Sequence, residues 1–274
     1  MLPQIVERTM ETLCEGLSRS NLNMESVYIY GSVALGDFIE GSSDIDFITI
    51  LREPPSMSDI ETISAAHQAV EREFPHADIM GAYLSIQDVG KAQSEQNFFL
   101  TYFNKQVHSN GYGADLNPIT WWILKNHGMK VYGAEQSFSY EVKTEDLLQY
   151  VIENLNTYWV SWIRRLEEQS TLLGTADPES VAKRLDTAVE WCTLGMLRQL
   201  YTLKEHDIRS KVQAGYYGMT TIPQQWHGLI HEAISIKRLR PDRVYDSHEK
   251  RLTDLIALLR YIHQEANRVF VERL

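Results

Sequence analysis

An aspartate pair that opens an apolar strand, preceded by a glycine-serine turn, most restricts how this chain can fold. Residues 27–30 (VYIY) are β-branched and aromatic and end at Gly31-Ser32, which is typical of a strand followed by a turn. Asp44-Ile45-Asp46 opens a second apolar strand that runs to residue 50. Because alternate strand residues share a face, both carboxylates are expected on one side and Ile45 in the core.

Two carboxylates on one face repel each other unless a cation lies between them. Magnesium suits this position, since it takes oxygen ligands and binds nucleotide phosphates. Gly31 lets the backbone approach a ligand closely, and Ser32 at a helix start is suited to donate to a phosphate oxygen. The four residues together therefore predict a site for magnesium and a triphosphate, with Asp44 and Asp46 as metal ligands.

A third carboxylate, Asp78, lies on a third predicted strand over residues 76–84. It is expected either to bind a second metal or to act as general base towards a substrate hydroxyl. Such a trio supports in-line attack of a hydroxyl on the α-phosphorus, with pyrophosphate as the leaving group. An isolated Asp-x-Asp is common on exposed strand faces, so the prediction depends on the ordered combination with Gly31-Ser32.

The other segments of the N-terminal half predict a small mixed α/β domain. Apolar spacing predicts a helix over residues 3–18 and another over 58–74 with Ser58 as its cap. The aromatic stretch 97–104 is interpreted as helical, and residues 119–126 as a helix that stops at Gly128. Residues 129–133 are expected to form a short strand or a loop.

The character of the sequence changes at Lys143, where strand patterns give way to long amphipathic segments. The expected helices cover residues 144–169, 179–204, 210–219, 222–239 and 247–271. The predicted fold class is therefore α+β. A catalytic α/β domain with a small mixed sheet spans residues 1–143, and an all-α helical bundle over 144–274 closes the cleft.

Net charge and cysteine content limit the partners and the compartment. The 274 residues carry a formal charge of -11, which disfavours a nucleic-acid partner and favours a cationic substrate. Two distant cysteines, Cys14 and Cys192, form neither a disulfide framework nor a zinc pattern, so a cytoplasmic location is expected. No apolar run is long enough to cross a membrane, and the oligomeric state is left as monomer or homodimer.

The residues around the aspartate pair resemble a known family. The run from Tyr28 to Gly36 (YIYGSVALG), followed by Ser43 to Phe47 (SDIDF), is similar to the signature of the DNA polymerase β-like nucleotidyltransferase superfamily. Within it, the chain resembles the aminoglycoside adenylyltransferases that modify streptomycin and spectinomycin. Further similar stretches are residues 117–121 (NPITW), 128–133 (GMKVYG), 197–201 (LRQLY) and 210–215 (SKVQAG).

The resemblance implies an ATP-dependent, magnesium-dependent enzyme of antibiotic resistance that transfers AMP to a hydroxyl of a cationic small molecule. It implies Asp44 and Asp46 as metal ligands and Asp78 as the catalytic base, where the family usually has glutamate. The implied nucleotide-binding residues are Gly31, Ser32, Ser43, Lys211 and Arg198. The implied acceptor contacts are Tyr102 or its neighbour Phe103, together with Asp186 or Glu190.

Several alternatives stay open at this point. Another small molecule or a protein hydroxyl is an alternative acceptor, and a regulator that binds nucleotide without catalysis is a further alternative. Asp186 and Glu190 are four residues apart, so they are equally compatible with a solvated helix face. Four tryptophans at helical spacing are interpreted as core residues rather than stacking platforms: Trp121, Trp122, Trp159 and Trp162. Lys237 stands where the family has an adenine-stacking tyrosine.

Overall fold

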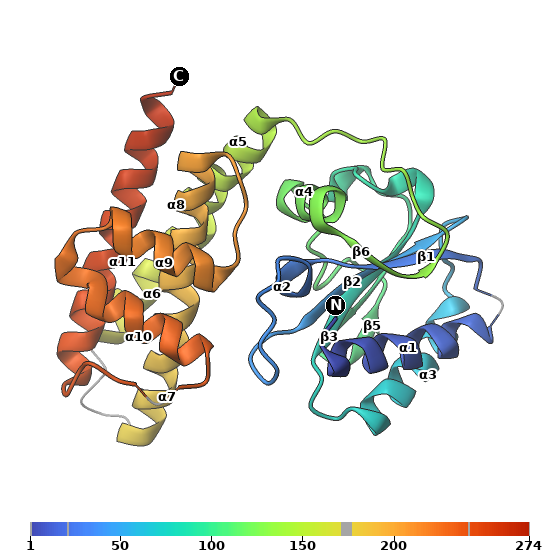
Figure 1. Ribbon diagram of the computed structural model, residues 1–274, viewed down its shortest axis with the longest axis horizontal. Helices are drawn as coiled ribbons and strands as arrows, with labels where there is room; N and C mark the ends of the chain where they lie inside the picture. Colours follow the sequence, from blue (N-terminus) through green and yellow to red (C-terminus); the bar gives the residue numbers. More distant parts are fainter. Residues whose placement is uncertain (1, 21, 171–176, 241, 274) are drawn as a thin grey trace. The chain divides into compact units, whose positions relative to one another are not determined.

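The computed structural model of the chain describes residues 2–20, 22–170, 177–240 and 242–273 (Figure 1). It separates into two compact units, Met1–Val142 and Lys143–Leu274. The first unit is a mixed sheet with helices and the second is helical, which confirms the α+β class. The roles expected for the two parts, catalysis and closure of the cleft, stay predictions.

A six-stranded mixed sheet forms the centre of the first unit, in the order β5-β4-β3-β2-β1-β6. Its only parallel pair among the described residues joins β2 to β3, with Ile45 opposite Ile79. The antiparallel neighbours of β2 and β3 are β1 and β4, respectively. The strands are β1 Met24–Ile29, β2 Ile45–Leu51, β3 Ile79–Ser85, β4 Leu100–Phe103, β5 Gln106–His108 and β6 Met129–Gly133.

Two long helices, α1 (Gln4–Ser18) and α3 (Asp59–Glu73), lie side by side on one face of this sheet (Figure 1). Their apolar faces bury residues such as Leu13 and Ile63 against Phe47 of β2, all without solvent exposure. Burial of this apolar surface is the main stabilising contribution to the unit. The short α2 (Gly31–Ala34) and α4 (Pro118–His127) lie on the opposite side of the sheet.

Local sequence explains most element boundaries and also the exceptions. Asn117 accepts backbone N–H groups of Ile119 and Thr120 and so begins α4, with Pro118 at its first position. Ser58 precedes α3 as expected, but its side chain makes no capping hydrogen bond; instead Asp59 accepts the Ser56 N–H at 2.7 Å. Ser58 therefore occupies the predicted N-cap position, but its side chain does not cap the helix.

The helical interpretation of residues 97–104 is also wrong, because this stretch contains β4. Aromatic residues are at home in strands, and here Tyr102 lies opposite Gly81 on β3. The turn to β5 uses Asn104 and Lys105 in the left-handed region, with φ of 50° and 59°. This turn geometry favours the hairpin of β4 and β5 at the edge of the sheet. Helical periodicity in the sequence does not predict such a hairpin.

The second unit is a bundle whose two longest predicted helices each contain a π-helical segment. Residues Leu155–Trp159 join α5 to α6, and Val189–Leu194 join α7 to α8. The two segments meet, since the rings of Trp159 and Trp191 lie 6.2 Å apart. The helices are α5 Thr144–Asn154, α6 Val160–Ser170, α7 Pro178–Ala188, α8 Gly195–Glu205, α9 Lys211–Thr221, α10 His227–Lys237 and α11 His248–Val271.

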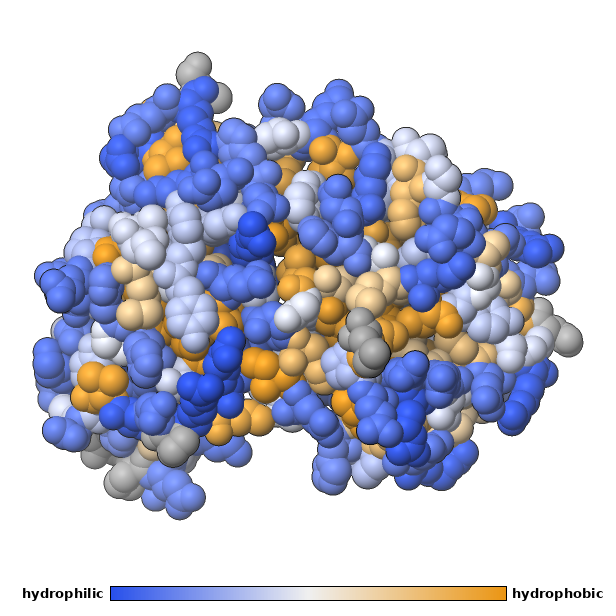
Figure 2. Space-filling model, viewed as in Figure 1, coloured by the Kyte–Doolittle hydropathy of each residue, from blue (hydrophilic) through white to orange (hydrophobic). Residues whose placement is uncertain are grey.

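Buried side chains confirm part of the tryptophan interpretation. Trp121 and Trp159 are 2% and 4% exposed, whereas Trp122 and Trp162 are half-buried. Gly195 fits directly against the Trp159 ring, since a Cβ atom there would lie 2.2 Å from it. Figure 2 shows that hydrophilic residues cover most of the face turned to the viewer. Across the described parts of the chain, no helix is long and apolar enough to span a membrane.

Glu265 on α11 gives a testable contribution to stability. Hydrogen bonds from Arg268 and Lys204, each at 2.8 Å, lower the pKa of Glu265 to about 2. A carboxyl with a lowered folded-state pKa stabilises the fold above its ordinary pKa, and this contribution disappears as the pH falls towards 2. We expect Glu265→Gln to lower the free energy of unfolding at pH 7 by about 1 kcal/mol.

Urea unfolding of the wild type and of this variant at pH 7, 4 and 2.5 measures the effect. The difference between the two proteins is expected to shrink steadily as the pH falls. Glu153→Gln on α5, where the side chain is exposed, is the matched control and should change little. A difference that stays constant over the whole pH range would contradict this assignment.

Candidate active site

The aspartate pair lies at the start of the central strand β2. Asp46 is on the strand and Asp44 comes directly before it; both are half-buried. Their neighbours Ile45 and Phe47 are 1% and 0% exposed on the helix-covered face. The expected alternation therefore holds, and the two carboxylates share the face opposite α1 and α3.

Gly31 is held against the Asp46 carboxylate. The Tyr30 N–H donates to the Asp46 carbonyl at 3.0 Å, which brings the end of β1 beside β2. Gly31 has φ of +61°, and a Cβ atom added there would lie only 1.8 Å from Asp46 Oδ2. Only glycine satisfies both conditions without displacing the carboxylate.

Ser32 supplies a polar atom with a vacant hydrogen-bonding capacity. Its Oγ is buried and has no hydrogen-bond partner among the described residues. Buried hydroxyl groups are nearly always satisfied, so this one suits a ligand that arrives with its own acceptor oxygen. Ser43 is different, because its Oγ accepts the Ile39 N–H at 3.2 Å and shapes the loop before Asp44.

Sequence reasoning missed a buried tyrosine and a fourth acid beside this pair. Burial raises the pKa of Tyr30 well above its usual range, and the carboxylates of Asp46, Asp115 and Asp44 raise it further. Tyr30 therefore stays protonated, with Thr120 of α4 as a hydrogen-bonding neighbour. The Asn-Pro helix start at residues 117–118 was the available signal, since Asp115 comes directly before it.

Asp78 joins the group through the backbone of the parallel strand pair. The Ile45 N–H donates to the Asp78 carbonyl at 2.8 Å, so Asp78 lies beside Asp44 at the start of β3, not within the strand. Desolvation raises the pKa of Asp78, as does the Asp44 carboxylate, whereas Lys105 lowers it. Lys105 shares with Asp78 a cavity of about 420 Å³ that also includes His76 and Asn104.

The donor set fits magnesium in one particular manner. No group of three or more histidine, cysteine, aspartate or glutamate side chains in the described ranges is arranged to hold a metal ion. Magnesium commonly binds through one or two carboxylates and completes its shell with water and substrate phosphate. Asp44 and Asp46 with a bound triphosphate meet that requirement, and the role of Asp78, as base or as further ligand, stays a prediction.

Tyr102 lies on the helix-covered face of the sheet, opposite to the carboxylates, and its contact with the acceptor stays a prediction. It is 2% exposed, stacks on His67 of α3 with ring centroids 3.3 Å apart, and donates to Glu71. Strand alternation turns the next residue, Phe103, to the carboxylate side, where it is half-buried. Of the predicted pair, Phe103 is therefore the residue on the carboxylate face, and its contact with the acceptor also stays a prediction.

In the helical unit, Lys211 and Glu190 form a mostly buried ion pair at 3.1 Å. Lys211 also lies over the ring of Trp191, with Nζ 4.1 Å from the centroid. Burial lowers the pKa of Lys211, with Glu190 opposing this and the cations Arg198 and Lys237 adding to it. Three cations around one acid give this cluster a positive balance, which suits an anionic ligand.

Asp186 is occupied by structural partners. Its carboxylate accepts Arg251 at 2.7 Å and also pairs with Arg243. Burial opposes ionisation of Asp186, but the hydrogen bonds from both arginines outweigh it and lower the pKa. Arg251 is itself 3% exposed and pairs with the fully buried Glu232. Of the two acids expected to contact an acceptor, only Glu190 stands outside this arginine network.

Comparison with known families matches both parts of the chain. Residues 10–95 match the family described as "Nucleotidyltransferase domain". This matched segment contains the Gly31-Ser32 turn and the three aspartates Asp44, Asp46 and Asp78. The chain is therefore a nucleotidyltransferase. Residues 175–261 match "Aminoglycoside adenylyltransferase, C-terminal domain". The two matches together identify the protein as an aminoglycoside adenylyltransferase-like enzyme, as its sequence motifs predicted.

A solved structure shares this fold over nearly the whole length. It is the crystal structure of spectinomycin adenyltransferase AAD(9) from Enterococcus faecialis with ATP and spectinomycin. The TM-score is 0.61 at 13% sequence identity, and the match covers 95% of this chain and 98% of that one. No curated protein matches the sequence.

The close approach of Gly31 to Asp46 can be tested with two glycines that share a backbone conformation. Gly36 also has positive φ, +71°, but no atom lies within 4 Å of the position of an added Cβ. Both alanine variants incur the left-handed strain, about 1–2 kcal/mol, and only Gly31→Ala displaces the carboxylate.

We expect Gly31→Ala to lower kcat at least 100-fold, while Gly36→Ala keeps turnover within a few-fold of the wild type. Thermal unfolding of both variants separates loss of activity from loss of the fold. Equal activity in the two variants would show that contact with Asp46 does not set the catalytic geometry.

Proposed function

We propose that this enzyme transfers AMP from ATP to a hydroxyl of a cationic acceptor, an aminoglycoside, in a magnesium-dependent reaction that releases pyrophosphate. The observation that carries the proposal is the buried, unpartnered Ser32 Oγ directly after Gly31, whose backbone lies against the Asp46 carboxylate. A hydrogen-bond donor and a pair of metal-ligating acids on one sheet face are what a nucleoside triphosphate requires.

Each polar residue of the N-terminal unit has a separate role in the proposed reaction. Asp44 and Asp46 hold the metal, which when bound neutralises charge on the triphosphate. Ser32 donates to a phosphate oxygen and Gly31 leaves room for the phosphates beside the Asp46 carboxylate. The acceptor oxygen then forms a bond to the α-phosphorus while the bond to the pyrophosphate oxygen breaks.

Asp78 is the proposed general base for that attack. Its ionised carboxylate takes the proton of the acceptor hydroxyl as the new phosphorus–oxygen bond forms. Its raised pKa makes it a stronger base than an ordinary aspartate, and Lys105 opposes full neutralisation. An aspartate in place of the family's usual glutamate reaches less far, so the acceptor hydroxyl must come closer to the β3 backbone.

The helical unit is proposed to supply the remaining contacts. Lys211 and Arg198 bind the triphosphate, in keeping with the positive balance of their cluster. Glu190 is preferred over Asp186 as the acid for a cationic acceptor, because Glu190 is paired with one cation, Lys211, whereas two arginines hold Asp186.

The acceptor class is supported by two similarities and one bulk property. Residues 175–261 match the C-terminal domain of aminoglycoside adenylyltransferases, and the similar solved structure contains ATP and spectinomycin. The charge of -11 favours the approach of a cation. We further propose that the enzyme acts in the cytoplasm, where ATP is available, as a monomer or homodimer.

Loss of either metal ligand tests the mechanism directly. We expect Asp44→Asn and Asp46→Asn to reduce turnover by about 10²–10³-fold, because several kcal/mol of charge stabilisation is removed. The measurement is pyrophosphate release with ATP, magnesium and spectinomycin or streptomycin, together with the mass of the adenylylated product. Asp59→Asn, which changes an acid at the start of α3, is the control and should remain active.

Full activity in either variant would overturn the metal assignment. A panel of acceptors tests the proposed substrate separately from the metal assignment. Turnover on a protein hydroxyl or on a neutral small molecule, without turnover on any aminoglycoside, would retain the chemistry and reject the proposed acceptor.

The pH profile tests the role of Asp78. Since Lys105 lowers the pKa of Asp78, removing that cation in Lys105→Gln is expected to raise it. The base is active when ionised, so the acid limb of kcat/KM should move to higher pH, with little change on the alkaline side. Arg19→Gln, an equal loss of charge at the far end of α1, is the control; identical acid limbs in both variants would exclude this role.

A further inference from the structure

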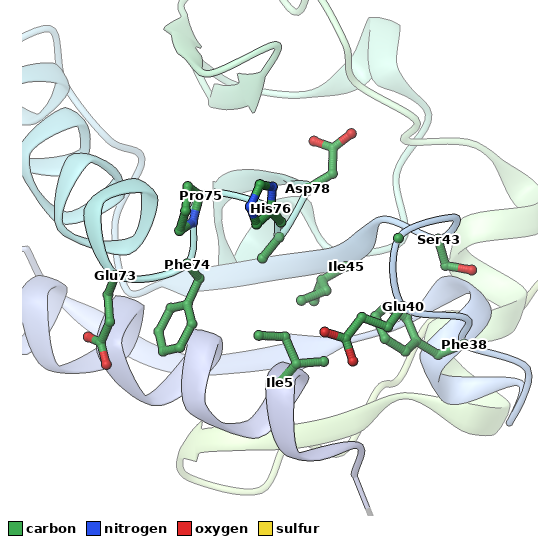
Figure 3. Close-up of a pocket in the computed structure, with 12 residues that line it drawn as sticks. Ile5, Phe38, Glu40, Ser43, Ile45, Glu73, Phe74, Pro75, His76 and Asp78 are labelled. Carbon is green, nitrogen blue, oxygen red and sulfur yellow. The ribbon is translucent and has the colours of Figure 1, made fainter. Parts of the chain in front are cut away.

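A second cavity lies behind the start of β2, on the side away from the catalytic carboxylates. Its volume is about 330 Å³, and its walls come from α1, from the loop over residues 38–43 and from the turn between α3 and β3 (Figure 3). Its apolar walls are formed by Ile5, Phe38, Ile45, Phe74 and Pro75. We call it the Glu40 cavity.

This cavity adjoins the proposed catalytic site, since Ser43 and Asp78 belong to both, but it lies on the other side of β2. Ile45 faces into it, and strand alternation therefore directs Asp44 and Asp46 to the other face; neither is among its lining residues. Asp78 belongs to the rim, but Figure 3 shows its carboxylate pointing away from Ile5 and Phe74. A ligand held here would contact the chain on both sides of Asp44, at Ser43 and Ile45, without occupying the catalytic face.

The charge of the walls favours a cation. Glu40, Glu73, Asp78 and His76 line the cavity, and none of its lining residues is a lysine or an arginine. The Asp78 carboxylate points away from the apolar walls, and Glu40 is exposed. Glu73 is already paired with Arg8 at 3.2 Å. Glu40 forms no hydrogen bond or ion pair with the described residues, and Figure 3 shows its carboxylate turned towards Ile5. An acid over an apolar floor is suited to an ammonium group attached to an apolar body.

The size of the cavity limits that body. An apolar cavity of about 150 Å³ is sufficient to hold benzene. The Glu40 cavity therefore has room for one ring and a short amine, and it is too small to enclose an aminoglycoside of several rings. We propose that it is a binding site for a small organic amine with an apolar ring, held by Glu40 through its ammonium group and by Ile5, Ile45 and Phe74 through its ring.

Three probes of the same shape and different charge test the proposal on the full chain without ATP or magnesium. Benzylamine, benzyl alcohol and benzoate are titrated at pH 7 and followed by calorimetry and by NMR chemical-shift mapping. We expect benzylamine to bind at least 10-fold more tightly than the alcohol and to shift the signals of Ile5, Ile45 and Phe74. Benzoate should not bind, although the first turn of α1 at Ile5 offers backbone N–H groups that favour anions.

Variants locate the site and the charge. Glu40→Gln should weaken benzylamine binding about 10-fold. The control is Glu61→Gln, the same change in the first turn of α3, at the end of that helix away from the cavity; it should leave binding unchanged. Ile5→Trp and Ala77→Leu each fill the cavity and should abolish benzylamine binding. Circular dichroism shows whether each variant has folded; if one has not, the result for the other variant tests the location of the site. Equal binding of alcohol and amine, preference for benzoate, no binding of benzylamine, or binding unaffected by the filling variants would each overturn the proposal.

Because these titrations contain no nucleotide, their outcome is independent of the proposed nucleotidyl transfer. Failure of amine binding with intact turnover rejects only the Glu40 cavity. Loss of turnover in Asp44→Asn with intact amine binding concerns only the catalytic face.

Discussion

Contact between the Gly31 backbone and the Asp46 carboxylate is the constraint on which the catalytic face depends. It holds the turn after β1 against the central strand β2. The hydrogen bond from the Tyr30 N–H to the Asp46 carbonyl fixes the register of that contact. The parallel pairing of β2 with β3 then brings Asp78 beside Asp44. This close approach and the strand pairing bring together Ser32, the two aspartates and Asp78 from three separate segments of the chain; these are the residues proposed to bind phosphate, to hold the metal and to act as the base.

The sequence predicted those features that depend on local periodicity. The strand that carries Asp46, the turn at Gly31-Ser32 and the long helices of the second half all follow from spacing and turn residues. Family resemblance added the enzyme class, which the two domain matches confirm. The roles of individual site residues are proposals that rest on where the structure places their side chains.

Features that depend on long-range pairing could not be predicted in this manner. Residues 100–103 become a strand because β3 offers an edge for them, and that same pairing turns Tyr102 towards His67. Asp115 joins the acids near Tyr30 only through the placement of α4. The ion pairs of Asp186 with Arg243 and Arg251 join residues 57 and 65 positions apart in sequence. Periodic patterns describe single helices and strands, so they do not predict such pairs.

The π-helical segment Val189–Leu194 has a consequence for how this chain is aligned with its relatives. Each residue of an α-helix turns the side chains by about 100°, so one extra residue within a helix rotates everything before it relative to everything after it. Asp186 precedes the segment, Glu190 lies within it and Arg198 follows it. Counting back from Arg198 as along a regular helix therefore assigns the wrong face to the residues before the segment. An acid that is conserved in space among such enzymes can occupy positions that differ by one in sequence.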